Sequence, residues 1–209
     1  MYAIAGDGCK IWYDGGSQAV LLIHGFASDS RHNWTAPGWG RVFPGAVVAD
    51  LRGHGQSDRP RAGFTPEQLA ADMAAVLDAA GLTTVDVVTY SMGGIVGWEL
   101  ARAGRVRRLV IGGLGGGTAS RADFERVLEA LPGNDDLQPC IDGMAGRRLA
   151  GEPPVPVLFA AGDADELAGD AAAFAESLGA PFVSLGKRNH FNAISSRVFK
   201  QAALEAFGS

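Results

Sequence analysis

The sequence predicts an α/β protein with an open, mostly parallel sheet that is covered by helices on both faces. Most of its short apolar runs are continuous rather than alternating, which is typical of strands buried on both faces. Segments with helical spacing of apolar residues lie between these runs, and such alternation of strands and helices favours a parallel sheet. The predicted strands are residues 20–23, 46–49, 85–88, 109–111, 155–161 and 182–185.

The helices between these strands are marked by their ends as well as by their periodicity. The clearest is predicted to begin at Pro66, because Thr65 can cap its first turn and Gln68 can reach back to Thr65. Gly81 then ends it, as glycine commonly does after the last turn of a helix. Further helices are predicted over residues 92–103, 170–178 and 196–207, and an edge hairpin over residues 2–4 and 10–13.

One segment interrupts the alternation of strands and helices. The chain's 209 residues suit one domain, 1–209, since domains usually hold roughly 100–200 residues. Residues 115–154 within it contain two helical patterns, 120–131 and 136–149, joined by residues 132–135. We therefore predict that residues 115–154 form a short lid, or cap insertion, over one end of the sheet.

Composition and charge argue against several classes of protein. Acidic residues outnumber basic ones by 23 to 18, for a net charge of −5, so we expect no nucleic-acid partner. The longest apolar stretches are far shorter than a membrane span, and the first residues lack the features of a signal peptide. Cys9 and Cys140 resemble neither a disulfide framework nor a metal site. The expectation is a cytoplasmic protein with free thiols, no metal and no membrane contact.

The sharpest local signal is Ser91, which lies between the strand over residues 85–88 and a helix that begins at Met92. A serine on such a tight strand-to-helix turn presents its hydroxyl off the end of the sheet. Gly93 leaves room after it, but Thr89 occupies the position before it where glycine is usual. Two interpretations therefore stay open: a nucleophile, or a serine that caps the helix.

A nucleophilic serine needs a base, and the base needs a group that orients it. Three of the four histidines, His24, His54 and His190, follow predicted strands. Loops that follow parallel strands emerge at one edge of the sheet, where ligands collect. Position alone therefore leaves all three as candidates for the base.

The positions of the acidic residues indicate which side chains could accompany Ser91. The strand over residues 155–161 runs into Gly162-Asp163-Ala164-Asp165-Glu166, and an acid there would lie beside the Ser91 turn. No acidic residue follows the preceding strand until Asp123. The candidate catalytic order is then Ser91, Asp165 and His190.

Five segments resemble the motifs of the α/β-hydrolase superfamily, in the order of that family and over nearly the whole chain. In that resemblance the Gly-x-x-Asp acid corresponds to Asp165 rather than Asp163, and the base corresponds to His190. The matching segments are Leu22-Ile23-His24-Gly25-Phe26, residues 50–57, Tyr90-Ser91-Met92-Gly93-Gly94, Gly162-Asp163-Ala164-Asp165 and Asn189-His190-Phe191.

The same resemblance assigns the two remaining histidines. The His-Gly pair marks the oxyanion loop, which implies a structural His24 and a backbone amide of Phe26 that stabilises the oxyanion. The second donor is the amide of Met92, directly after the nucleophile. The Arg-Gly-His-Gly segment matches a structural turn, so His54 is not expected to be catalytic.

The activity that the resemblance implies is cleavage of carboxylic esters, with small or medium acyl groups, through an acyl-enzyme. A lactonase such as an enol-lactone hydrolase, or a carbon–carbon bond hydrolase, would use the same triad. A non-catalytic ligand-binding protein of this fold is the alternative from another class. Dehalogenases and epoxide hydrolases of the fold use an aspartate nucleophile, so Ser91 argues against both. No cofactor is expected, because the glycine run at 112–117 departs from a dinucleotide pattern at Thr118.

The substrate partner is expected to be a small ester or lactone, but few residues indicate how it is held. Phe26, Met92 and Trp34 are candidates to wall an acyl pocket, and Phe191 lies beside the base. Aromatic residues on such loops serve equally often in packing, which leaves the role of Trp34 open. Relatives with a full cap domain are usually longer, so a reduced lid and an open, shallow site are expected.

Overall fold

The computed structural model describes residues 1–131 and 135–208, and it confirms the predicted α/β class. Within these residues eight strands form one sheet in the order β1-β2-β4-β3-β5-β6-β7-β8. The β1–β2 and β2–β4 pairs are antiparallel, and every other pair is parallel. The strands are β1 (Tyr2–Ile4), β2 (Lys10–Asp14), β3 (Val20–Ile23), β4 (Val47–Ala49), β5 (Val85–Tyr90), β6 (Val106–Gly112), β7 (Val157–Ala161) and β8 (Phe182–Ser184).

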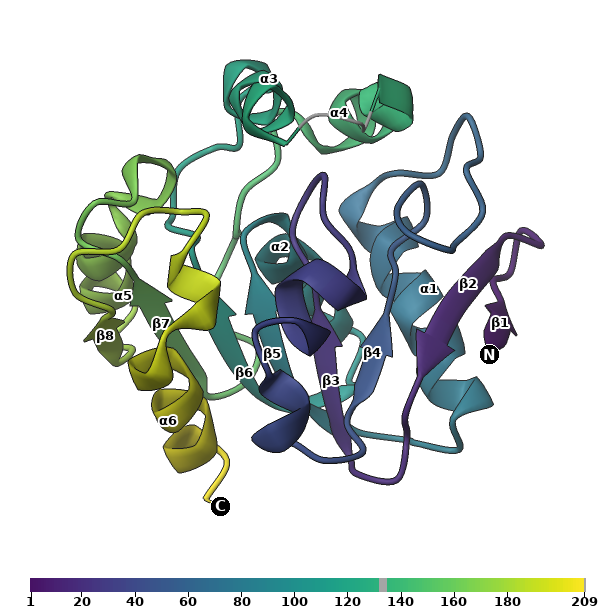
Figure 1. Cartoon of the computed structure of the whole chain (residues 1–209), viewed down its shortest axis with the longest axis horizontal. Coiled ribbons are helices and arrows are strands. Elements are labelled where there is room, and N and C mark those ends of the chain that lie inside the picture. Colours follow the sequence, from purple (N-terminus) through teal and green to yellow (C-terminus); the bar gives the residue numbers. More distant parts are fainter. Residues whose placement is uncertain (132–134, 209) are drawn as a thin grey trace.

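Helices cover both faces of this sheet, as predicted (Figure 1). Each face has its own hydrophobic core: Leu21 and Val87 belong to one, Leu22 and Val88 to the other, because successive side chains of a strand point to opposite faces. The first core is closed by α1 (Pro66–Ala79), α2 (Met92–Arg102) and α5 (Ala171–Ser177). The second is closed by α6 (Arg197–Ala206) and the short helical turns η1 (Arg31–Thr35) and η2 (Trp39–Arg41).

The ends of α1 follow the prediction except at Gln68. Thr65 Oγ1 accepts a hydrogen bond from the Gln68 amide at 3.3 Å, and Gly81 follows the helix with φ of 73°. The Gln68 side chain does not reach back to Thr65, however. It donates to Asp72, whose carboxylate is buried and holds the Arg52 guanidinium at 2.6 Å through both oxygens.

Two strands, β6 and β7, begin at residues other than the predicted ones. β7 begins at Val157 rather than at residue 155, because Pro156 has no amide hydrogen to donate to a neighbouring strand. β6 begins earlier than its apolar run, because Arg107 and Arg108 both pair with Asp86 of β5 at 3.0 and 2.8 Å.

Two helices from the segment 115–154, α3 (Arg121–Ala130) and α4 (Gln138–Met144), lie over the end of the sheet (Figure 1). The segment also contains the turn η3 (Asp135–Leu137). Of the predicted junction at residues 132–135, residues 132–134 lie outside the described residues. α4 ends before residue 149, because Gly146 and Arg147 exchange backbone hydrogen bonds with Ala119 instead. Cys140 of α4 lies against Met92 of α2, with Sγ 3.7 Å from Sδ.

Three observations bear on the classes considered above. No helix among the described residues is long and apolar enough to cross a membrane. Within the same residues, no group of three or more histidine, cysteine or acidic side chains is arranged to hold a metal ion. Cys9 and Cys140 are buried free thiols.

Candidate active site

Ser91 occupies a strained turn between β5 and α2. Its backbone has φ of 51° and ψ of −126°, and Ala27 is the other described non-glycine residue with positive φ. Such a conformation persists only where the surroundings fix it. Here the Ser91 amide donates to Gly112 and its carbonyl accepts from Gly94, both at 2.8 Å. Ser91 occupies the N-cap position of α2, as the helix-cap interpretation expects, but its side chain makes no capping hydrogen bond to the helix.

The residues two positions either side of Ser91 show how the turn fits. A Cβ atom on Gly93 would lie 2.6 Å from the carbonyl oxygens of Ile23 and His24, so only glycine fits there. Thr89 is fully buried, and its hydroxyl donates to the Val110 carbonyl at 3.2 Å. Its methyl group points at Gly97, where a Cβ would be only 2.7 Å away. The glycine that makes room for the close contact between strand and helix is therefore Gly97 of α2, whereas β5 carries Thr89.

His190 and Asp165 complete a hydrogen-bonded chain to Ser91. Nε2 of His190 lies 3.1 Å from the Ser91 hydroxyl oxygen, and Nδ1 lies 3.0 Å from each carboxylate oxygen of Asp165. A carboxylate accepts from the protonated Nδ1, which leaves the lone pair of Nε2 facing the serine. Asp165 is 2% exposed and His190 is 8% exposed, so this chain is shielded from water.

Of the two aspartates in the loop after β7, only Asp165 faces His190. Asp163 is exposed and accepts a hydrogen bond from the Ser184 hydroxyl. Gly162 brings this loop against the histidine loop, since a Cβ there would lie 1.9 Å from the Arg188 carbonyl oxygen.

The His24 ring supports the backbone of the oxyanion loop. It is fully buried, its Nε2 accepts from the Leu51 amide at 2.9 Å, and its Nδ1 donates to the Gly25 carbonyl at 2.7 Å. Burial lowers the pKa of His24, which keeps the ring neutral and suited to these two bonds.

His54 holds the same loop two residues further on, at Ala27. Its Nε2 accepts from the Ala27 amide at 3.3 Å, and its Nδ1 donates to the Arg52 carbonyl at 3.0 Å. Burial lowers the pKa of His54 to about 3. Both rings thus use their nitrogens on backbone groups, and neither is hydrogen-bonded to Ser91.

Two backbone amides beside Ser91 are left without acceptors. Among the described residues, no protein acceptor is hydrogen-bonded to the amide of Phe26 or of Met92. Met92 is the first residue of α2, where helix amides have no partner within the helix. Such paired donors are the arrangement that stabilises an oxyanion.

Comparison with known proteins agrees with this architecture. Residues 18–116 match the family model of the alpha/beta hydrolase fold. The chain has the α/β-hydrolase fold. Solved structures that superpose on this α/β-hydrolase-fold protein include the enol-lactonase from Burkholderia xenovorans LB400, with a TM-score of 0.82, 20% identity and 100% of each chain covered. An esterase from Rhodococcus sp. ECU1013 has a TM-score of 0.71 and 25% identity, with 91% of each chain covered.

Among curated proteins, a segment of 143 residues is 34% identical to the dihydrolipoyllysine-residue acetyltransferase component of the acetoin cleaving system of Cupriavidus necator. That match covers 65% of this chain and 38% of the acetyltransferase component. The chain spans about a quarter to two fifths of the length of the curated relatives it matches.

Two cavities of the α/β-hydrolase-fold protein meet at Ser91, and Phe26 and Val127 line both. The larger has a volume of about 200 Å³, and the smaller has about 140 Å³. Apolar residues of the larger include Met92, Ile95, Leu114, Phe124 and Leu167. The smaller is lined by Ser28, His32, Asn33, Tyr90, His190 and Phe191, among others.

Residues of α3 help to line the two cavities, so the site is less open than expected. Phe124 packs on Phe26 with ring centroids 4.8 Å apart, and Val127 lines both cavities. Ser91 nevertheless stays half-buried rather than deeply covered. Phe124, Val127 and Leu131 recur at helical spacing, a stripe that could have identified these lining residues from the sequence.

The two aromatic residues proposed to bind substrate have different positions. Trp34 lines neither of the two cavities among the described residues; it is fully buried and packs edge-on against Trp39 at 5.3 Å. Its expected role in the pocket is therefore wrong, because η1 turns the indole into the core beneath the loop. Phe191 is 45% exposed, lines the smaller cavity and lies 5.8 Å from the His190 ring.

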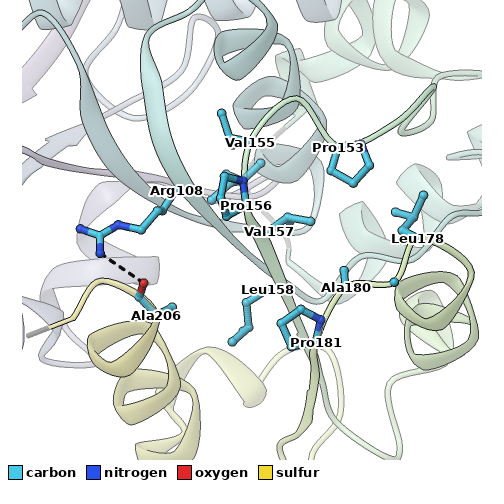
Figure 2. A pocket seen from close by; sticks show the side chains of 12 residues that line it. Arg108, Pro153, Val155, Pro156, Val157, Leu158, Leu178, Ala180, Pro181 and Ala206 are labelled. Atoms are coloured by element: carbon cyan, nitrogen blue, oxygen red, sulfur yellow. Dashed lines mark hydrogen bonds between the residues drawn. The ribbon is translucent and has the colours of Figure 1, made fainter.

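A separate cavity of about 440 Å³ lies at the other end of the sheet, where β6, β7 and β8 begin (Figure 2). Pro153, Pro156 and Pro181 give it an apolar wall, and Arg108 bonds to the Ala206 carbonyl at its edge. Its lining, among the described residues, contains no serine, histidine or carboxylate. Ser91 and Asp165 lie at the opposite end of the strands, after β5 and β7.

Proposed function

We propose that this protein is a serine hydrolase that cleaves carboxylic esters through an acyl-enzyme intermediate. The observation that carries the proposal is the continuous chain from the Asp165 carboxylate through His190 to the Ser91 hydroxyl, with contacts of 3.0 and 3.1 Å. In this proposal Ser91 is the nucleophile, His190 the general base and acid, and Asp165 the orienting group.

The first half of the reaction forms the acyl-enzyme. Nε2 of His190 takes the hydroxyl proton as Ser91 Oγ forms a bond to the ester carbonyl carbon, and the carbonyl oxygen becomes an oxyanion. The carbon–oxygen bond to the alcohol then breaks, and His190 returns the proton to the leaving oxygen. Asp165 stabilises the imidazolium that exists between these two transfers.

The amides of Phe26 and Met92 are proposed to bind the oxyanion. The loss of one such donor in comparable sites reduces kcat by roughly 10²–10³-fold. The fixed loop at Ala27 and the start of α2 hold both amides in place before substrate arrives, which avoids reorganisation during the reaction.

The second half of the reaction uses water in place of the alcohol. His190 takes a proton from water as the hydroxide oxygen bonds to the acyl carbon, and then returns that proton to Ser91 Oγ as the acid is released. No further reactant is needed, so the cycle restores the starting enzyme.

The test is the reactivity of Ser91. A fluorophosphonate probe should label the wild-type protein, and 4-nitrophenyl esters should be hydrolysed; Ser91→Ala should lose labelling and about 10⁴–10⁶-fold in kcat. Ser177→Ala is the matched control, because Ser177 is an exposed serine near the end of α5 and should behave as wild type. Ester hydrolysis by Ser91→Ala within tenfold of wild type would contradict the proposal.

Assays of lactone hydrolysis and of ester binding, added to this experiment, separate the alternative functions. Faster turnover of lactones than of open-chain esters would make the protein a lactonase with this triad. An unreactive wild-type protein that still binds esters would favour a non-catalytic binding protein of the same fold.

A further inference from the structure

The two cavities at Ser91 are chemically different, and the position of His190 decides what each one holds. His190 lines the smaller cavity and not the larger one. In the proposed reaction Nε2 of His190 must reach the leaving oxygen, so the alcohol portion of the ester lies in the smaller cavity. The acyl portion then extends into the larger cavity, between Met92 and the lid residue Phe124.

The larger cavity combines an apolar interior with carboxylates from three different elements. Asp123 comes from the first turn of α3, Glu166 from the turn after β7, and Asp170 from the residue before α5. No lysine or arginine lines this cavity among the described residues. Arg126 lies 3.9 Å from Glu166 and offsets one of the three charges. The surroundings of the cavity therefore carry a net negative charge.

On the basis of the proposed ester hydrolysis, we infer that the larger cavity is an acyl pocket that accepts uncharged acyl groups and discriminates against acyl groups bearing a carboxylate. An acyl carboxylate would lose hydration against Phe26, Ile95 and Leu114 without gaining a cationic partner. It would also be repelled by the carboxylates around it. The volume of about 200 Å³, below the roughly 300 Å³ at which drug-sized sites begin, restricts the pocket to short acyl groups.

A pair of esters that differ only in acyl charge tests this inference. 4-Nitrophenyl pentanoate and the 4-nitrophenyl half-ester of glutaric acid have the same leaving group and equally long acyl chains. We expect kcat/KM for the glutarate to be at least about tenfold lower. The difference should shrink as salt is raised from low to about 1 M, because salt screens solvent-exposed charges.

A charge reversal at Glu166 tests the cause. Its side chain is 88% exposed, so Glu166→Lys is compatible with the fold. The ratio of glutarate to pentanoate kcat/KM should rise by about threefold to tenfold in this variant. Glu176→Lys is the matched control: it makes the same change of net charge at the far end of α5, and the ratio should stay at the wild-type value.

The outcomes separate this inference from the function on which it rests. Equal or faster hydrolysis of the glutarate, with Ser91 still labelled by fluorophosphonate, would overturn the charge selection and leave the hydrolase intact. An unchanged ratio in Glu166→Lys would also overturn it. Absence of hydrolysis of both esters together with an unlabelled Ser91 would overturn the proposed function and this inference with it.

Discussion

The hydroxyl of Tyr90 donates a hydrogen bond of 2.6 Å to the backbone carbonyl of His190. Tyr90 is buried, and burial raises the pKa of its hydroxyl well above the ordinary value, so the group stays a donor. The residue before Ser91 is thus hydrogen-bonded to His190, the proposed general base. We therefore expect the distance between Ser91 Oγ and His190 Nε2 to depend on this hydrogen bond as well as on Asp165.

Tyr90→Phe should therefore act on the chemical step. Without the hydroxyl, the His190 carbonyl loses its partner and the imidazole is less well aligned with Ser91. We expect kcat to fall by about tenfold with KM little changed, and fluorophosphonate labelling to slow in parallel, because small misplacements of reacting groups reduce rates strongly. Steady-state kinetics and labelling rates measure both effects.

The control for this change is Tyr2→Phe, which removes an exposed hydroxyl from the edge strand β1. It should leave both rates unchanged. A Tyr90→Phe protein with wild-type kcat and a normal melting curve would show that Asp165 alone suffices to position His190.

His54 gives the protein a specific acid sensitivity. Its pKa is about 3 in the fold, against an ordinary value of 6.5, so between these values the unfolded chain binds a proton that the native protein does not. The free energy of unfolding therefore falls as pH decreases below 6.5. His24, whose pKa is also lowered by burial, acts in the same direction.

His54→Gln should reduce the slope of unfolding free energy against pH between pH 4.5 and 6.5, because the group that takes up the proton on unfolding is gone. Urea titrations at several pH values give this slope. The wild-type protein, titrated under the same conditions, is the reference for this slope. An unchanged slope in His54→Gln would mean that His54 takes up no extra proton on unfolding.

The glycine run after β6 packs closely against α5 and the residue before it. The Asp170 carboxylate accepts hydrogen bonds from the amides of Gly116 and Gly117 at 3.1 and 2.9 Å. A Cβ on Gly116 would lie 2.2 Å from the Phe174 ring, whereas one on Gly117 would have an ordinary contact of 3.5 Å. We expect Gly116→Ala to destabilise the protein by about 1–3 kcal/mol and Gly117→Ala to be nearly neutral in urea unfolding. Equal effects of the two substitutions would contradict this difference.

Much of the sheet was predictable because buried parallel strands have continuous apolar runs. The start of β6 was not, since Arg107 and Arg108 have the composition of a surface loop. They lie in the strand because Asp86 of the neighbouring strand accepts hydrogen bonds from both. A pairing between residues that are distant in sequence has no local signature.

The candidate site likewise combines residues that the sequence could predict with residues that it could not. Ser91, Asp165 and His190 follow parallel strands of one sheet, and the topology alone brings such residues to one edge. Tyr90 was missed because its partner is 100 positions away, and no local pattern reports that contact. Trp34 was misplaced because an aromatic residue on a loop has the same sequence signature whether it faces a cavity or the core.

Thr89 and Gly97 offer a test of how the turn at Ser91 fits without the usual glycine on the strand. The Thr89 methyl group packs against Gly97, and a Cβ atom on Gly97 would lie only 2.7 Å from that methyl group. Gly97→Ala should therefore destabilise the protein by about 1–3 kcal/mol through overpacking.

The same substitution in a Thr89→Gly background should have a much smaller effect or stabilise the protein. The clash with Thr89 is then absent, and alanine favours a helix over glycine by about 1 kcal/mol. Urea unfolding of wild type, both single variants and the double variant gives the coupling energy between the two positions. Additive changes in the free energy of unfolding would show that the packing of Thr89 does not require glycine at position 97. Retained fluorophosphonate labelling in the double variant would show that a glycine on the strand and one on the helix are interchangeable supports for Ser91.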